Sequence, residues 1–192
     1  NQDMLIKRQA VKGAMWCALM VLLPSAQAFE LQGEKTLVAE TRDGQHTRIG
    51  RVEFTPAEKG QAKIRVSMDH AVMRDHFLSM REFKCLAAAL EVTCHVPYPY
   101  ANPATVSQDN WQWLDHHLLF LYKKPADFGA KLWNGIIFRW RMTPTGLEGL
   151  PQAVDLNLIS APPDKFDLPP YGLADSEPFA PDARWIRKLR IE

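Results

Sequence analysis

Alternating apolar and polar residues predict that most of this chain folds into β-strands. The clearest stretch is 62–69, where apolar side chains at even-numbered positions alternate with polar ones. Successive side chains of a strand point to opposite faces, so this stretch is typical of a half-buried strand. The same period predicts further strands at residues 29–40, 48–54, 90–96, 136–142 and 154–158. Short turns such as Asp43-Gly44 separate them, which favours antiparallel pairing.

Three other segments have a different or an ambiguous period. Residues 70–82 carry apolar side chains spaced i, i+4 and i+7, which predicts a short amphipathic helix or an ordered loop across one end of the sheet, although residues 79–83 could equally begin the next strand. Residues 107–124 predict one or two helical turns and then a strand that ends at Pro125, although the run LLFLY is also typical of a strand buried on both faces. Residues 183–191 predict an edge strand or a short helix.

About eight strands connected in sequence order predict a mainly β fold. We expect an antiparallel meander that closes into a roughly eight-stranded barrel, or a two-sheet sandwich, with one or two short helices. Lipocalins are an architectural analogy for such a barrel, but the chain lacks their Gly-x-Trp signature near the first strand, so no family is assigned. The predicted β domain spans 29–159. Residues 160–192 predict a proline-rich arm and a terminal strand or helix packed on the same domain.

The segment 1–28 predicts an N-terminal extension and a cleavable secretory signal. After Met4, the expected initiator, a basic stretch precedes an apolar run at 14–23 and then Ala26-Gln27-Ala28, with small residues where a signal peptidase cleaves. The apolar run is shorter than the roughly 20 residues that a membrane span needs. We therefore expect a periplasmic or secreted protein that begins at Phe29, with no stable membrane span after cleavage.

Two cysteines remain after the predicted cleavage. Cys85 and Cys94 are nine positions apart, so the chain can leave the strand that carries Cys85, turn, and form a second strand beside it that carries Cys94. Paired cysteines in an oxidising compartment favour a disulfide. We expect Cys85 and Cys94 to form a disulfide bond between neighbouring strands.

The charge balance bears on the partners. Residues 1–28 carry three basic and one acidic side chain, and removing them leaves 20 basic and 21 acidic ones. No basic excess remains to neutralise phosphates, so nucleic-acid binding is not expected. The predicted partner is a small amphipathic ligand or an envelope protein.

Aromatic side chains are the main candidates for ligand binding. Large rings combine apolar contact area with a polar group, so they can line an opening for an apolar or carbohydrate ligand. The alternative is that the tryptophans fill the core and the tyrosines pin loops. Asp155 and Asn157 are either hydrogen-bonding groups inside a cavity or part of a solvated face. The predicted ligand-binding residues are Tyr98, Tyr100, Trp111, Trp113, Trp140, Asp155 and Asn157.

Neither a metal site nor another cofactor is predicted. The residues weighed as metal ligands are His95, Asp115 and His116. Adjacent strand residues point to opposite faces, and the spacing of two histidines in helical zinc sites does not occur in the sequence. The same three residues, together with Asp69, are candidates for a hydrolase that uses a histidine and an aspartate.

The favoured function is a non-catalytic module that binds a small amphipathic or apolar ligand or an envelope partner. Two alternatives stay open. One is the hydrolase, for which the sequence contains neither a Gly-x-Ser-x-Gly turn nor a phosphate-binding glycine loop. The other is an accessory protein that docks on another chain through its proline-rich arm.

Overall fold

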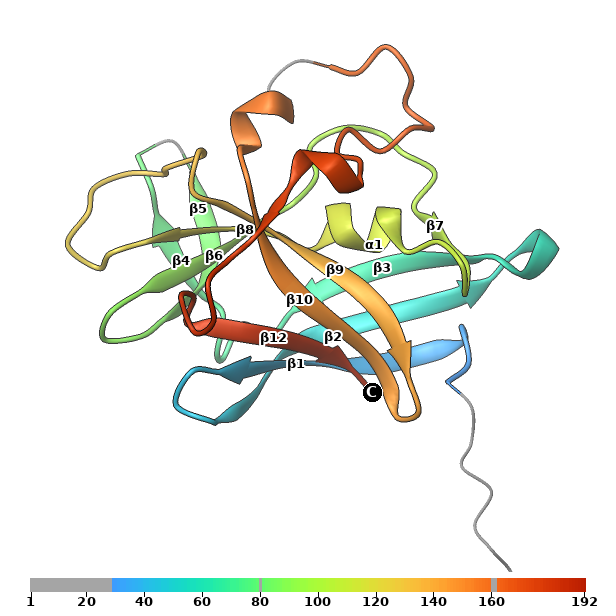
Figure 1. The fold of residues 1–192 in the computed structure, drawn as a ribbon, viewed down its shortest axis with the longest axis horizontal. Coiled ribbons are helices and arrows are strands. Elements are labelled where there is room, and N and C mark those ends of the chain that lie inside the picture. The colour runs from blue at the N-terminus through green and yellow to red at the C-terminus, as the bar shows by residue number, and fades with distance from the viewer. Residues whose placement is uncertain (1–28, 80, 160–161) are drawn as a thin grey trace, which may run out of the picture.

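The computed structural model describes residues 29–79, 81–159 and 162–192, and within them the chain forms an antiparallel sheet with one α-helix (Figure 1). The predicted signal segment, 1–28, lies outside the described residues. In the described part, no helix has the length and apolar character needed to cross a membrane.

The regular elements follow one another along the chain with short connections. The strands are β1 (Gly33–Thr41), β2 (His46–Pro56), β3 (Ala62–Met68), β4 (Arg74–Phe77), β5 (Glu82–Ala87), β6 (Val92–Val96), β7 (Thr105–Val106), β8 (Leu119–Lys123), β9 (Gly135–Thr143), β10 (Gly146–Val154), β11 (Glu177–Pro178) and β12 (Ile186–Ile191). The helix α1 spans Gln112–His117, and the 3-10 segments η1, η2 and η3 span Glu58–Gly60, Leu156–Ile159 and Leu173–Asp175.

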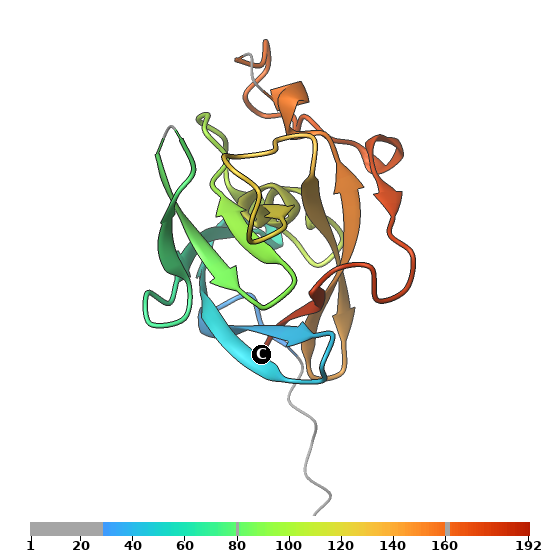
Figure 2. The same cartoon turned by 90° about the vertical axis from the view of Figure 1, so that its left-hand side faces the viewer.

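All twelve strands of the described residues belong to one sheet with the order β4-β5-β6-β8-β9-β10-β12-β1-β2-β3-β7, and β11 pairs with β10. The sheet curves strongly, as Figures 1 and 2 show, and β4 and β7 remain as its two ends. The predicted mainly β, antiparallel fold is confirmed. The predicted closed barrel is not confirmed, because the hydrogen-bonded path stays open.

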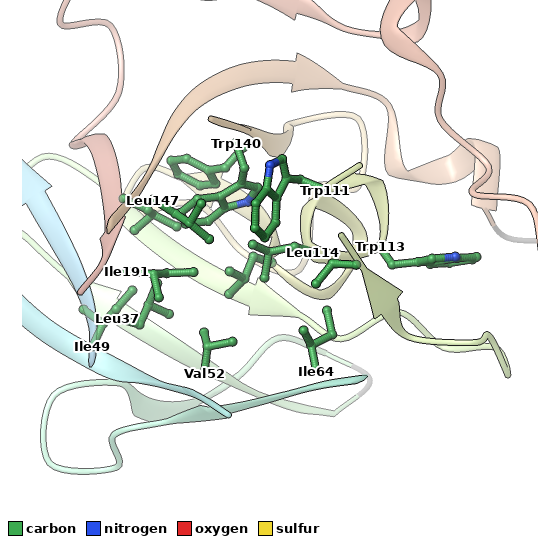
Figure 3. Close-up of a cluster of buried hydrophobic side chains, with 14 of the residues drawn as sticks. Leu37, Ile49, Val52, Ile64, Trp111, Trp113, Leu114, Trp140, Leu147 and Ile191 are labelled. Carbon is green, nitrogen blue, oxygen red and sulfur yellow. The ribbon is translucent and has the colours of Figure 1, made fainter. Parts of the chain in front are cut away.

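Two apolar clusters hold the sheet together, and β8 contributes to both. Phe120 of β8 belongs to the main cluster, part of which Figure 3 shows, whereas Leu119 and Leu121 belong to the second cluster. Because alternate strand residues point to opposite faces, β8 is buried on both sides. The helix–strand prediction for residues 107–124 is therefore confirmed, and the run LLFLY is a strand buried on both faces.

The helix or loop predicted for residues 70–82 is wrong. Strand β4 lies there and pairs with β5, with His76 opposite Phe83. Met73 is fully buried and Phe77 is 68% exposed, so the helical spacing of these two residues does not mark a common face. The structure of residues 74–77 is therefore determined by their pairing with β5 and not by the local spacing of apolar side chains.

The strand predicted at 154–158 is also wrong. Strand β10 ends at Val154, and η2 follows it. The sequence did not predict β10 as a strand, because Gly149 and Pro151 both weaken a strand prediction. Pro151 has no N–H to donate to a neighbouring strand. On this side of β10, residues 147–149 pair with β12 and residues 152–153 pair with β11, so Pro151 falls in the gap between the two pairings.

The C-terminal segment forms a strand, β12, and not a helix. It lies between β10 and β1 in the middle of the sheet, so the prediction of an edge strand is wrong. Leu189 pairs with Ala39 on one side and with Gly149 on the other. The two ends of the described chain therefore meet through strand pairing.

The predicted link between Cys85 and Cys94 is confirmed. The two residues lie directly opposite each other on β5 and β6, and their sulfur atoms are 2.01 Å apart. Both side chains are fully buried in the second apolar cluster. The disulfide bond thus joins adjacent strands, as the spacing of the cysteines predicted.

Candidate functional site

The tryptophans of the predicted ligand site lie in the main apolar cluster. Trp111, Trp113 and Trp140 are 9%, 6% and 8% exposed. Figure 3 shows Trp113 extending away from the other two. Gly149 makes room for the Trp140 ring, because a Cβ atom at Gly149 would lie 3.0 Å from the ring. These contacts support the alternative in which the tryptophans fill the core.

Tyr98 and Tyr100 belong to an aromatic cluster beside α1. The Tyr98 ring lies 5.9 Å from Tyr100, 5.8 Å from Trp113 and 6.1 Å from His116 between centroids. His116 in turn stacks on Tyr171, with centroids 5.6 Å apart. Aromatic packing at these distances stabilises the position of the chain segments that carry the rings. The cluster therefore fixes the loop after β6 and the segment around Tyr171 against α1.

Asp155 directly precedes η2 and Asn157 lies within it, and both side chains are exposed. The Asp155 carbonyl accepts a hydrogen bond from the Tyr171 hydroxyl, so this turn contacts the aromatic cluster through its backbone. Asp155 Oδ1 accepts hydrogen bonds from the backbone N–H of Asn157 (2.9 Å) and from its Nδ2 (2.8 Å). Such a contact stabilises a turn. The two residues make a local turn motif on a solvated face.

A buried ion pair joins α1 to β9. Arg139 Nη1 donates to Asp115 Oδ2 at 2.7 Å, and Arg139 Nη2 donates to the Gly172 carbonyl at 2.7 Å and to Ser176 Oγ at 3.0 Å. Burial raises the pKa of Asp115 to about 7, against the lowering effect of Arg139. Arg139 therefore connects the helix, the sheet and the segment before β11.

His116 uses both ring nitrogens inside the protein. Nδ1 donates to the Gln112 carbonyl at 2.7 Å, because a carbonyl can only accept, and Nε2 accepts the N–H of Tyr171 at 3.1 Å. His116 is fully buried, and this burial lowers its pKa to about 4. The imidazole is therefore neutral near pH 7 and serves as a fixed link to Tyr171.

The neighbouring histidines have similar structural contacts. His95 Nε2 donates to the His117 carbonyl at 2.9 Å, and His117 Nδ1 donates to the Trp113 carbonyl at 2.7 Å. Burial lowers the pKa of His95 to about 4 and also lowers the pKa of His117. The His95 hydrogen bond holds α1 against β6, whereas the His117 hydrogen bond lies within α1.

The candidate metal and hydrolase residues do not form one open centre. Asp69 lies in the turn after β3, where its Oδ1 accepts the N–H of Ala71 at 3.0 Å. Among the described residues, no group of three or more His, Cys, Asp or Glu side chains is placed to hold a metal ion. Asp115 and His116 are adjacent in α1, but Asp115 contacts Arg139 and His116 contacts Tyr171.

A pocket of about 840 Å³ lies where four connections meet at one side of the sheet, and we call it the lateral pocket. These connections are the β1–β2 turn, the β5–β6 hairpin, the end of β8 with the following loop, and the residues before β12. They lie on the left-hand side of Figure 1, the side that faces the viewer in Figure 2. The pocket is lined by Arg42, Ala89, Leu90, Glu91, Tyr122, Lys123, Lys124, Pro125, Ala126, Asp127, Lys131, Asn134, Ala183 and Arg184.

The lateral pocket contains a stacked arginine. The Arg184 guanidinium lies 3.5 Å from the centroid of the Tyr122 ring and 5.1 Å from that of Phe179. Its Nη1 is 3.4 Å from Glu91 Oε2. Cation–π stacking of this kind fixes the plane of the guanidinium.

Sequence reasoning missed this pocket, since none of its lining residues was a predicted site residue. One local signal exists: Lys123 directly follows the apolar run LLFLY, at a position buried in the strand. No local pattern reveals the other contacts, because Arg42, Glu91, Tyr122 and Arg184 meet only through strand order.

No family model, curated protein or solved structure matches this chain.

Proposed function

We propose that this protein is an exported, non-catalytic module that binds a small amphipathic ligand in the lateral pocket. The observation that carries the proposal is the pocket itself, with a volume of about 840 Å³. Small-molecule sites in proteins have volumes of roughly 300–1,000 Å³ and combine apolar walls with a few polar groups.

The lining has the two kinds of surface that an amphipathic ligand needs. Leu90 is 68% exposed, and Ala89, Pro125 and Ala126 lie beside it in the lining. An apolar chain that covers these residues removes their surface from water, which favours binding. Polar and charged side chains occupy the rest of the lining.

The contacts of the histidines favour binding over catalysis. A general base needs a nitrogen that is free to take a proton from a substrate. His116 has both nitrogens engaged, and the Nε2 atom of His95 is engaged by the His117 carbonyl. The proposal of export draws on the signal pattern at 1–28 and on the Cys85–Cys94 disulfide, which is typical of oxidising compartments.

A neutral fluorescent probe tests this function. N-phenyl-1-naphthylamine should bind the mature protein saturably, with an increase in fluorescence. Ala126→Trp places a large ring in the pocket lining and should weaken binding at least about tenfold, that is by roughly 1.4 kcal/mol or more. Ala174→Trp, at an exposed alanine of η3 outside the pocket lining, is the matched control and should bind as the wild type does.

The proposal fails if the wild type shows no saturable binding, or if both tryptophan variants bind the probe equally well. Native mass spectrometry of gently purified protein provides a second measurement, because a retained small molecule appears as added mass.

Docking on an envelope partner is a second candidate function. Phe166, Leu168 and Leu173 are 49%, 54% and 76% exposed, and they lie close together in sequence around the anchored Tyr171. A photocrosslinking residue at position 168 should give a discrete adduct in the periplasm, and the same residue at Leu150, 43% exposed on β10, should not. Equal labelling at both positions would remove this candidate.

A further inference from the structure

We propose that the ligand of the lateral pocket is an amphipathic anion whose carboxylate or phosphate head group is held by basic residues of the lining, with Lys123 as its main partner and Arg184 as a further donor. The proposal rests on the lateral pocket being the binding site, and it adds the charge and the position of the ligand's head group.

Lys123 is the first observation. It lines the pocket and is only 9% exposed, yet its ammonium group has no hydrogen-bond or ion-pair partner in the described part of the chain. Burying an unpaired charge is costly, so a lysine in this position keeps its charged end toward solvent or toward an anion. Nζ is not among the fully buried polar atoms that lack a partner, so it reaches solvent. An anion bound there would supply the missing partner.

Arg184 is the second observation. Its guanidinium makes no hydrogen bond among the described residues, and Nε and Nη1 are buried without a hydrogen-bond partner. Stacking on Tyr122 holds the guanidinium in one plane. Nη2 is not among the buried atoms, so an arginine fixed in this way can donate through Nη2 to a carboxylate or phosphate with little loss of side-chain entropy.

The charge of the whole lining is the third observation. Five basic and two acidic side chains line the pocket, and both acids already have partners. Asp127 pairs with Lys131 at 2.8 Å, and Glu91 lies 3.4 Å from Arg184 while also accepting the N–H of Trp185 at 3.1 Å. The surplus is positive although the chain as a whole is nearly balanced, with 23 basic and 22 acidic residues. A local positive surplus attracts an anion.

The apolar part of the lining determines the rest of the ligand. Leu90, Pro125 and Ala126 provide a surface for an alkyl or aryl chain next to the positive residues. A bare inorganic anion would leave this surface in water. The two features together favour a ligand that has an anionic head and an apolar tail.

The test compares four compounds that each contain a ten-carbon chain, used at pH 7.5 below the micelle concentration or, for decanol, below the solubility limit. Decanoate, decyl phosphate, decanol and decyltrimethylammonium compete with bound N-phenyl-1-naphthylamine. We expect at least one of the two anions to displace the probe at a concentration about tenfold or more below that of decanol, since a hydrogen bond to a charged group contributes roughly 1.5–3 kcal/mol. The cation should be the weakest competitor. The tighter anion identifies the head group.

Lys123→Met locates the charge, because methionine keeps the apolar stem and removes the ammonium group. The variant should reduce the anion preference over decanol to about threefold or less while decanol binds as before. Lys63→Met, at an exposed lysine of β3 outside the pocket lining, is the matched control and should keep the full preference.

The outcomes separate the two proposals. If decanol competes as well as both anions in the wild type, the anion proposal is overturned and the binding function stands. The anion proposal also fails if Lys123→Met keeps the full preference. If the probe itself does not bind, the binding function fails first. The comparison of ligands on the wild type needs no variant, so it remains decisive even if Lys123→Met does not fold.

Discussion

Acid should destabilise this protein through His116. The unfolded chain binds a proton on this histidine near its ordinary pKa of 6.5, whereas in the folded protein burial lowers the pKa to about 4. Protonating Nε2 would also remove the acceptor of the Tyr171 N–H. At pH values between about 4 and 6.5 the unfolded chain binds more protons on this histidine than the folded protein does. The contribution of neutral His116 to the free energy of unfolding is therefore fully present above pH 6.5 and is lost as the pH falls toward 4.

The size of the effect follows from the same two values. The gap between 6.5 and about 4 corresponds to roughly 3 kcal/mol, and roughly 2 kcal/mol of that is lost between pH 7 and pH 5. Asp115 acts in the opposite direction. Burial raises its pKa to about 7, so the folded protein takes up a proton there as the pH falls. His95 and His117, whose pKa values burial also lowers, act in the same direction as His116. The total pH profile therefore mixes titrations of opposite sign, and a variant is needed to isolate His116.

His116→Gln removes the titration and keeps a side-chain oxygen that can accept the Tyr171 N–H. Urea unfolding followed by tryptophan fluorescence at pH 7, 6 and 5 gives the free energy of unfolding of each protein. Because both proteins contain Asp115, His95 and His117, the wild type should lose roughly 2 kcal/mol more than the variant between pH 7 and pH 5. His70→Gln, at an exposed histidine, is the control and should follow the wild type. An equal loss in the wild type and His116→Gln would refute the reasoning.

Three further predictions concern the covalent link, the ion pair and a close backbone contact. Replacing Cys85 and Cys94 by alanine should lower the free energy of unfolding by about 2–3 kcal/mol, and dithiothreitol should produce a similar loss in the wild type but none in the variant. Arg139→Met leaves Asp115 buried without its partner and should cost about 3–5 kcal/mol in urea unfolding; a loss below about 1 kcal/mol would contradict a structural role for the pair. Gly50→Ala should lower the free energy of unfolding by about 1–3 kcal/mol and with it the thermal midpoint, because its Cβ would lie 2.3 Å from the Ser67 carbonyl oxygen. An unchanged midpoint would show that the backbone shifts to relieve this contact without cost.

The local pattern predicted individual elements well where pairing and period agree. In β3 the alternation of side chains matches burial, with Ala62 and Ile64 buried and Lys63 and Arg65 exposed. In 70–82 and 146–154 the local signals point elsewhere. A four-residue strand has too few side chains to impose a period on its sequence, and Pro151 is tolerated only because of where β11 and β12 pair.

The candidate site was predicted less well, for a related reason. Aromatic residues were chosen because their side chains are large, and large side chains also fill cores, as Trp111 and Trp140 do. The lateral pocket instead depends on basic residues that are unremarkable in the sequence. Only burial distinguishes Lys123 from the exposed Lys124 beside it.

The sequence by itself determined the strand-rich character, the helix and strand of residues 107–124 and the pairing of Cys85 with Cys94, because each depends on side chains near one another in the chain. Tertiary structure alone decided the order of the strands. β12 pairs with β1, which lies near the other end of the described chain, and also with β10. That choice is made by the total burial and hydrogen bonding of the sheet, which no local pattern records. The same strand order brings Arg184 onto the ring of Tyr122 and places Lys123 in the lining of the same lateral pocket.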